Sequence, residues 1–287
     1  MECDLVVQRK EKVSIEIVTP DLALEWITGP SNRQNRPVSK GWVNKLVTDI
    51  LEGRWELNGE TIKFDTEGDL IDGQHRLYAI VEANVPLPMT VVRGLPREVR
   101  HTIDIGRKRS LGSIIHMQGV ANGNGIVALS RAVIRYQGDL SLTWSGHNSP
   151  TDGQILEMVE AKHDQLQAAY SYGTEIQNAV SGSATAHGVL AYMAVNHTKH
   201  RSQFESFHDA LKSGEMLATG NPALVLRNWY IDPRRERMAR DAGQQKYVNV
   251  EVRAFNAFMR PGKIITRKAL HLNDPVTPMV KIKPDAR

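Results

Sequence analysis

The sequence predicts an α+β protein, with an N-terminal α/β domain over residues 1–112 and a mostly helical domain over residues 113–287. Two observations lead to this prediction. Residues 13–93 alternate short β-branched segments with amphipathic helical segments, as in a small α/β unit. Beyond Gly94 the apolar residues recur mainly at helical spacing, and loops rich in Gly, Asn and Ser separate the segments.

The first expected strand covers residues 13–18, where apolar and polar residues alternate. A helix should follow, because Thr19 is a good N-cap and Pro20 suits the first helical position. The clearest helix of the chain starts after Ser39, which we expect to cap it, and ends at Gly53, which supplies a left-handed stop.

The rest of the first domain is expected to contain a hairpin of two strands at residues 61–64 and 70–71. A helix at residues 74–84 and a last strand at residues 87–92 should follow. Residues 99–111 are expected to form a basic connector. In the second domain, the helical patterns fall at residues 126–136, 152–170, 185–196, 202–212, 222–230 and 248–259.

The composition is that of an ordinary globular chain, with 41% hydrophobic and 24% charged residues. No apolar run approaches the ~20 residues of a membrane helix, so no membrane partner is expected. Residues 1–12 lack the apolar region of a secretory signal. The single cysteine, Cys3, rules out an internal disulfide and a Cys-based zinc site. We therefore expect a reducing, cytoplasmic setting.

The charge is unevenly distributed along the chain. Residues 227–287 carry 14 Lys and Arg against 6 Asp and Glu, whereas the preceding part carries 22 against 26. A basic tail on a slightly acidic body fits the binding of a polyanion such as DNA. A solvated basic surface explains the same numbers equally well.

The strongest functional signal is the segment Asp72-Gly73-Gln74-His75-Arg76, between an expected strand and an expected helix. Gly73 can expose backbone amides at a helix N-terminus, which favours an anion. Arg76 can contact a phosphate through two hydrogen bonds, and His75 can donate to it or move a proton. Gln74 can position water or substrate, and Asp72 can hold Mg²⁺ or activate a nucleophile. An ordinary helix start, with Asp72 as cap and solvated His75 and Arg76, explains the same residues.

Residues 54–94 resemble the core of the ParB/sulfiredoxin superfamily, in which a strand leads into a Gly-x-x-Arg turn, a helix and a strand ending near Val-Val. The Asp-Gly-Gln-His-Arg segment is closer to the DGQHR proteins linked to DNA phosphorothioation, and to the DGQQR motif of certain modification-dependent restriction proteins, than to the Gly-Glu-Arg-Arg of ParB. The resemblance covers residues 13–110, and the helical remainder has only a general likeness to ParB-like phage proteins.

This resemblance implies a nucleoside triphosphate, ATP or CTP, bound with Mg²⁺. By position, Gly73, His75 and Arg76 would contact phosphates. The upstream Asn35 and Arg36 resemble the Asn-x-Arg segment near the nucleotide in ParB relatives and would be secondary contacts.

One position departs from the superfamily in an informative way. Sulfiredoxins carry their reactive cysteine between the glycine and the histidine, where this chain has Gln74. The reduction of sulfinic acid is therefore not expected, and Gln74 is counted with the nucleotide-binding residues.

Two further basic clusters are candidates for binding phosphates. Arg107, Lys108 and Arg109 follow a glycine and can contact a nucleotide or DNA, although a solvated link explains them too. Near the C-terminus, Phe255 and Phe258 alternate with cations, so this region can stack on and follow a nucleic-acid strand. The cations concerned are Arg253, Arg260, Arg267 and Lys268. A helix that buries its aromatic face is the alternative.

Other residues are expected to be structural. The histidines at positions 187, 197, 200 and 208 do not form a zinc-binding His-Glu-x-x-His pattern, so no metal is expected there. The tryptophans Trp26, Trp42 and Trp55 are expected in the core.

Three functions remain open. In the first, the chain binds ATP or CTP with Mg²⁺ and catalyses hydrolysis or phosphotransfer to DNA or a nucleotide, as in DNA modification. There Asp72 acts as base or metal ligand and His75 and Arg76 stabilise charge. In the second, it is a non-catalytic ParB-like DNA-binding regulator switched by nucleotide. In the third it is a DNA nuclease or nickase, although the chain lacks a convergent carboxylate cluster around Asp72. A homodimer is among the assemblies that the sequence allows.

Overall fold

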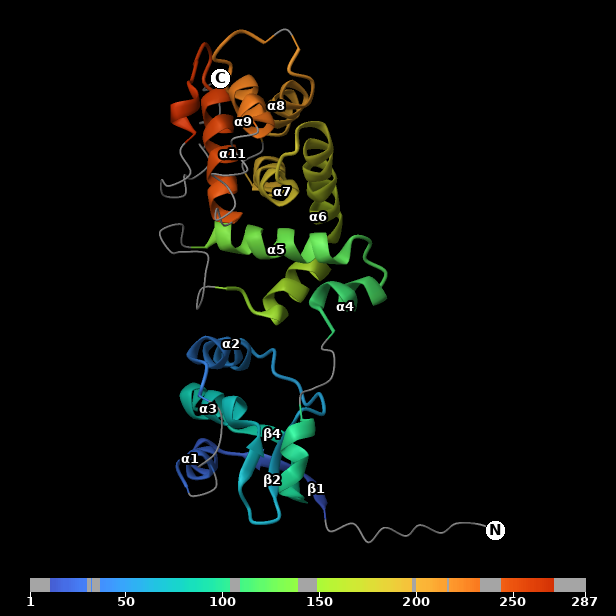
Figure 1. Ribbon diagram of the computed structural model, residues 1–287, viewed down its shortest axis with the longest axis vertical. Coiled ribbons are helices and arrows are strands. Elements are labelled where there is room, and N and C mark those ends of the chain that lie inside the picture. The colour runs from blue at the N-terminus through green and yellow to red at the C-terminus, as the bar shows by residue number, and fades with distance from the viewer. Residues whose placement is uncertain are drawn as a thin grey trace, which may run out of the picture. The chain divides into compact units, whose positions relative to one another are not determined.

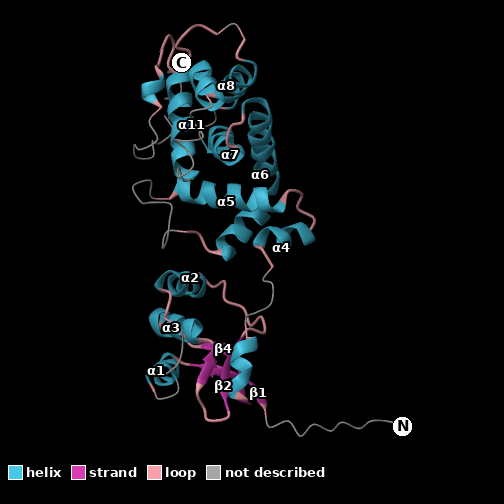
Figure 2. Cartoon of the chain, in the orientation of Figure 1, coloured by secondary structure: helices cyan, strands magenta, loops and turns pink. Residues whose placement is uncertain are grey.

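The computed structural model describes residues 11–29, 32, 37–103, 109–138, 149–197, 200–215, 217–232 and 244–270. The chain divides into two compact units, Met1–Lys108 (unit 1) and Arg109–Arg287 (unit 2). The structure is of the α+β class with a helical majority (Figure 2). Among the described residues, no helix has the length and apolar character needed to cross a membrane.

Unit 1 contains a four-stranded mixed sheet in the order β1-β4-β2-β3, accompanied by three helices (Figure 1). Strand β4 pairs antiparallel with β1 and parallel with β2, and β2 pairs antiparallel with β3. The elements are β1 (Lys12–Val18), α1 (Pro20–Thr28), α2 (Lys40–Leu51), β2 (Thr61–Asp65), β3 (Leu70–Asp72), α3 (Gln74–Ala83) and β4 (Leu87–Leu95).

The core of unit 1 forms where α3 contacts α1 and α2 and where alternate residues of the strands point inward. Ile62, Leu77 and Ile80 are completely buried. On β1, by contrast, the alternating apolar residues Val13 and Ile15 are about two-thirds exposed, at 68% and 66%. The alternation therefore predicted the strand correctly, but its apolar side chains lie on the exposed face.

Unit 2 is helical throughout its described residues. Its helices are α4 (Leu111–Met117), α5 (Gly123–Gln137), α6 (Asp152–Val180), α7 (Ala184–Tyr192), α8 (Arg201–Ser213), α9 (Pro222–Ile231) and α11 (Gln244–Phe258). Two short 3₁₀ helices, Arg97–Thr102 in unit 1 and Arg267–Ala269 in unit 2, complete the description.

Helix α7 is the centre of unit 2, since almost all of it is buried and it contacts α5, α6 and α11. Small residues make this possible. A Cβ on Gly173 of α6 would lie 2.0 Å from the carbonyl oxygen of Ala184, so the start of α7 can approach α6 only at a glycine.

Several expected elements differ from the structure. The helix expected at residues 152–170 continues to Val180, with non-helical backbone angles at Lys162. The helix expected at residues 185–196 changes to a π-helix at Met193–His197. Part of the expected connector is helical, because Ser110 caps α4 through its side chain. Trp42 is 51% exposed, so its assignment to the core was wrong.

Candidate functional site

Strand β3 ends at Asp72 and α3 begins at Gln74, so the predicted strand-turn-helix exists. The N-cap is Gly73, with φ +103°, and not Asp72. A Cβ at position 73 would lie 3.1 Å from Cα of Ile62 in β2. The glycine is therefore required by the left-handed backbone and by close packing on β2, independently of any ligand.

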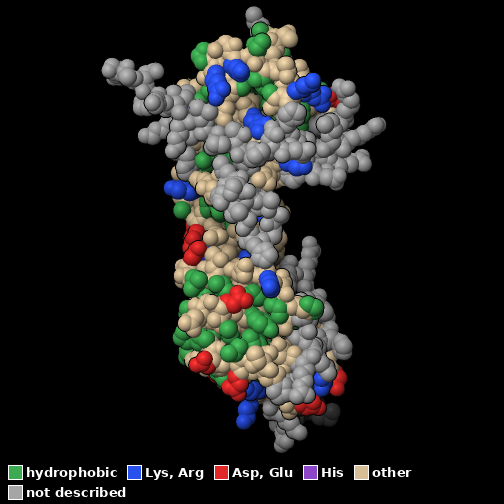
Figure 3. Space-filling model, turned by 90° about the vertical axis from the view of Figure 1, so that its left-hand side faces the viewer, with side chains coloured by type: hydrophobic (Ala, Val, Ile, Leu, Met, Phe, Trp, Pro, Cys, Tyr) green, Lys and Arg blue, Asp and Glu red, His purple; other side chains and the backbone are tan. Residues whose placement is uncertain are grey.

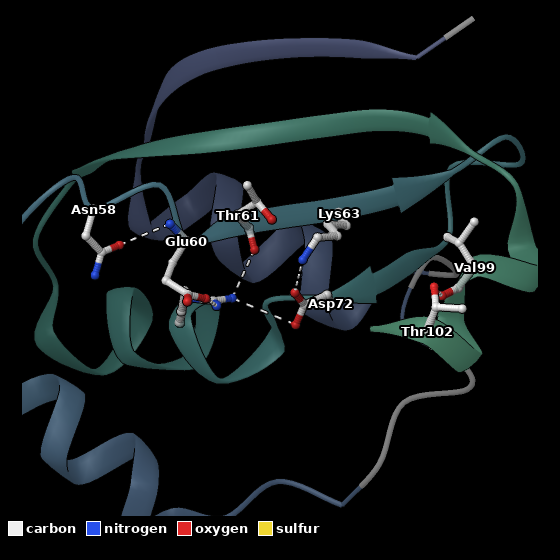
Figure 4. A network of polar contacts seen from close by, with 8 residues as sticks. Asn58, Glu60, Thr61, Lys63, Asp72, Val99 and Thr102 are labelled. Atoms are coloured by element: carbon white, nitrogen blue, oxygen red, sulfur yellow. Dashed lines mark hydrogen bonds and ion pairs between the residues drawn. The ribbon is translucent and has the colours of Figure 1, made fainter. Parts of the chain in front are cut away.

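The carboxylate of Asp72 lies between two cations (Figure 4). Nζ of Lys63 is 2.5 Å from Oδ2, and one terminal guanidinium nitrogen of Arg76 is 3.9 Å from Oδ1. The sequence reasoning missed Lys63. The signal was available, because Lys63 is the residue opposite Asp72 in the β2-β3 pairing, where opposite charges attract.

The guanidinium of Arg76 joins the start of α3 to the start of β2. It donates a hydrogen bond of 3.0 Å to the carbonyl oxygen of Thr61 and forms an ion pair with Glu60 (Figure 4). The side chain of Arg76 is 17% exposed, whereas that of Glu60 is 62% exposed. The protein interior therefore holds Arg76 in place through Thr61, and the exposed carboxylate of Glu60 covers its outer side.

His75 and Gln74 are buried, so the alternative of an ordinary helix start with a solvated His75 does not hold. Nε2 of His75 accepts a hydrogen bond of 3.0 Å from the backbone N–H of Ser39. This nitrogen is therefore unprotonated, and it fixes the start of α2 to the start of α3. The side chain of Ser39 makes no capping hydrogen bond, contrary to expectation.

The geometry of Asp72 does not fit a ligand of Mg²⁺. Lys63 occupies one carboxylate oxygen and the guanidinium of Arg76 faces the other. Within the described ranges, no group of three or more His, Cys, Asp or Glu side chains is arranged to hold a metal ion. The roles of Asp72, His75 and Arg76 in catalysis stay predictions.

Four of the predicted nucleotide-binding residues, Asn35, Arg36, Arg107 and Lys108, lie outside the described residues. Arg109 is described and is exposed immediately before α4. Among the described residues of unit 1, the predicted nucleotide site consists of Asp72–Arg76, with Lys63 and Glu60 as additional members.

In the described part of the C-terminal basic region, the cations are largely exposed but the aromatic rings are not. Phe255 is completely buried, and the ring of Phe258 packs on that of Phe207 at 5.2 Å. The stacking role was therefore wrong for Phe255, and the alternative of a buried aromatic face holds. Of the four cations, Arg253 is half-buried, Arg260 and Lys268 are exposed, and Arg267 is paired with Asp232. Figure 3 shows Lys and Arg side chains on one face of unit 2.

A second polar cluster, which the sequence reasoning missed, crosses the core of unit 2. Nδ1 of His187 lies 3.1 Å from Oε2 of Glu251, and Nε2 of His187 lies 3.0 Å from Nδ1 of His208. Nε2 of His208 lies 3.2 Å from Oε2 of Glu175, and the hydroxyl of Tyr230 donates to Oε1 of Glu251 at 2.6 Å. These groups come from five helices, so no local spacing could have revealed them.

The cluster runs from a buried carboxylate to the surface. Glu251 and His187 are completely buried, whereas the side chain of Glu175 is 47% exposed and also accepts from Lys212 at 2.6 Å. Burial and the nearby His187 lower the pKa of His208 below its ordinary value, against the opposing hydrogen bond to Glu175. The arrangement is a chain of pairwise contacts without a common centre, so it ties helices together and does not form a metal site.

Fold and site together define a two-unit α+β protein whose first unit presents an ion-paired strand-turn-helix. Comparisons of the chain with models of protein families, with curated proteins and with solved structures found no match.

Proposed function

We propose that this chain is a nucleoside-triphosphate-binding protein acting in DNA transactions, and that the Asp72–Arg76 segment holds phosphate. The observation that carries the proposal is the position of Arg76. Its guanidinium is oriented by the carbonyl of Thr61 and by Asp72, and its outer partner is the exposed carboxylate of Glu60.

Glu60 marks the position that an anion takes. A carboxylate and a phosphate both accept two charge-assisted hydrogen bonds from a guanidinium, and a phosphate carries more charge. Exposed ion pairs contribute only about 0–1 kcal/mol, so Glu60 is easily displaced. A phosphate in its place would lie beside the first turn of α3, where the helix dipole favours negative charge.

Lys63 adds to the attraction for an anion. In the present arrangement Lys63 and Arg76 are balanced by Asp72 and Glu60. Once Glu60 turns away, two cations face a single carboxylate, and the group carries one net positive charge next to a helix N-terminus. The nucleoside triphosphate and the DNA association follow from the resemblance to ParB-like proteins and from the exposed cations near the C-terminus.

A specific observation favours nucleotide switching as a second candidate beside phosphoryl chemistry. Asp72 is neutralised by Lys63, and Nε2 of His75 is engaged with Ser39. A general base needs an available lone pair, and in this arrangement Nε2 of His75 is occupied by Ser39 while Oδ2 of Asp72 is engaged by Lys63. A phosphate that moves the first turn of α3 would instead move His75 and, through Ser39, the start of α2.

The test is a thermal-shift panel of ATP, CTP, GTP and dNTPs with Mg²⁺, followed by product analysis with and without DNA. The variants are Arg76→Gln and, as a matched control, Arg97→Gln, whose guanidinium pairs with Glu67 and Asp69 in the same unit. We expect one nucleotide to stabilise the parent and Arg97→Gln but not Arg76→Gln. Product formation supports phosphoryl chemistry, and binding without product supports switching. If no nucleotide stabilises the parent, or if Arg76→Gln is stabilised equally, the proposal fails.

A further inference from the structure

Unit 2 holds a pair of arginines whose positive charge is only partly compensated by the described residues around them. Arg131 and Arg135 lie one turn apart on α5, beside the start of α6. One terminal guanidinium nitrogen of Arg135 donates a hydrogen bond of 2.9 Å to the hydroxyl of Ser149. One terminal nitrogen of Arg131 is 3.9 Å from Oδ1 of Asp152, which is beyond hydrogen-bond distance.

Arg135 is the less satisfied member of the pair. Its Nε is buried and has no hydrogen-bond partner in the described part of the chain. Among the described residues its hydrogen-bond partner is the neutral Ser149, and its charged neighbour Arg131 has the same sign. Burial first, and then the charge of Arg131, lower the pKa of Arg135 below its ordinary value. A half-buried cation with a like-charged neighbour at four residues' distance is unfavourable for the fold.

The neighbouring helix end does not provide the missing negative charge. Helix α6 begins at Asp152, so its positive dipole end faces the same region. The capping box satisfies two of the backbone N–H groups at this end, those of Thr151 and Gln154. The carboxylate of Asp152 is 63% exposed and compensates only Arg131, at long range.

We propose that Arg131, Arg135 and Ser149 form a binding site for a phosphate group, separate from the Asp72–Arg76 segment. Two guanidinium groups and a hydroxyl are the donors that recognise phosphate oxygens. The bound phosphate supplies a negative charge that the described residues around the two arginines do not provide. This site lies in unit 2 and does not rest on the function proposed for unit 1.

Two sources present this chemistry: the terminal phosphates of a free nucleotide and the phosphodiester backbone of a nucleic acid. The experiment therefore has two arms, one with inorganic pyrophosphate and one with a single-stranded oligothymidylate, at constant ionic strength. The full chain is measured by isothermal titration calorimetry and thermal unfolding, as the parent and as Arg135→Gln, Arg131→Gln and Arg76→Gln. Arg201→Gln is the matched control, because Arg201 is exposed on α8 and pairs with Glu205.

Arg135→Gln removes an unbalanced charge, so we expect it to unfold at a temperature equal to or above that of the parent when no anion is present. We also expect it to bind the anion roughly tenfold or more weakly, since it loses a charge-assisted hydrogen bond. Arg131→Gln should also bind the anion more weakly than the parent. If Arg135→Gln fails to fold, Arg131→Gln alone tests the proposal. Arg201→Gln should bind like the parent. Binding that persists in Arg76→Gln separates this site from the one in unit 1.

Stronger binding of pyrophosphate than of the oligonucleotide assigns the site to a free nucleotide, and the reverse order assigns it to a nucleic acid. The proposal is overturned if neither anion binds the parent, or if the arginine variants of α5 bind both anions as tightly as Arg201→Gln does.

Discussion

The backbone N–H of Ser39 donates a hydrogen bond to Nε2 of His75, at 3.0 Å and across 36 residues of sequence. This contact joins the first residue before α2 to the first turn of α3. The contact explains why His75 is buried although it lies in a segment typical of phosphate binding. Because of this contact, a movement of the first turn of α3 would also move the start of α2.

His75→Ala should destabilise unit 1, because it leaves the backbone N–H of Ser39 without its acceptor and opens a gap in a buried position. The hydrogen bond is only partly buried, and losing such a bond typically costs about 1 kcal/mol, to which the gap left by the buried imidazole adds. Urea unfolding should report this loss, whereas His163→Ala, at a 44% exposed position on α6, should be nearly silent. Equal unfolding free energies for the two variants would remove the structural role of His75.

Gly73→Ala should be more destabilising than Gly59→Ala. Both glycines have positive φ, of +103° and +84°, so alanine is strained at either position. Only at position 73 would the new Cβ also meet Ile62, whereas nothing lies within 4 Å of one at position 59. We expect about 1 kcal/mol for the backbone strain alone and a clearly larger loss for Gly73→Ala. Denaturant unfolding of the two variants compares them directly, and the same loss in both would contradict the close contact with β2.

The stability of unit 2 should fall in mild acid because of His208. Its pKa in the folded protein is below the ordinary value of 6.5, so the unfolded chain binds more protons as the pH falls below 6.5. The stabilisation is therefore present above pH 6.5 and is lost as the pH falls towards the lowered pKa. The pKa of Glu175 is also lowered, chiefly by its hydrogen bond from Lys212, and this adds a second loss below its ordinary value of 4.5.

The measurement is the unfolding free energy between pH 7.5 and 5.5 for the parent and for His208→Asn, which cannot titrate. The variant should show a flatter dependence on pH in this range, while the exposed-site control His163→Asn should follow the parent. A parent whose stability does not change between these pH values, or rises in acid, would contradict the assignment.

Tyr230→Phe should destabilise unit 2 by about 1–3 kcal/mol, because it leaves Oε1 of the completely buried Glu251 without its 2.6 Å donor. Tyr172→Phe is the matched control, since the hydroxyl of Tyr172 lies 3.5 Å from a partly exposed Glu205. Thermal unfolding should separate the two variants by several degrees. Similar melting temperatures would show that Glu251 does not depend on Tyr230.

Local patterns predicted most elements of both units because each depends on neighbouring residues. The Thr19-Pro20 start of α1 and the left-handed Gly53 after α2 are found as expected. The ends of helices were harder to predict. Helix α6 continues ten residues beyond the expected end at Tyr170, where small residues such as Gly173 allow α7 to pack closely.

The candidate site could be located from the sequence but its internal contacts could not. Asp72–Arg76 lies at the predicted strand-turn-helix, yet the partners that define its charge, Lys63 and Glu60, are supplied by β2 and its approach. The contact of His75 with Ser39 and the cluster of His187, His208 and Glu251 depend on tertiary packing. Such contacts join residues that are far apart in the sequence, so local spacing does not reveal them.

The central claim is that Arg76 holds a phosphate at the position of the Glu60 carboxylate. The measurement is a calorimetric titration with the nucleotide that best stabilises the parent. Glu60→Gln should bind this nucleotide more tightly than the parent does, because the competing negative charge is absent. Arg76→Gln should bind it at least roughly tenfold more weakly than the parent. Glu67→Gln, which removes an exposed carboxylate paired with Arg97, should bind like the parent. Affinities that are the same in the parent, Glu60→Gln and Arg76→Gln would contradict the claim.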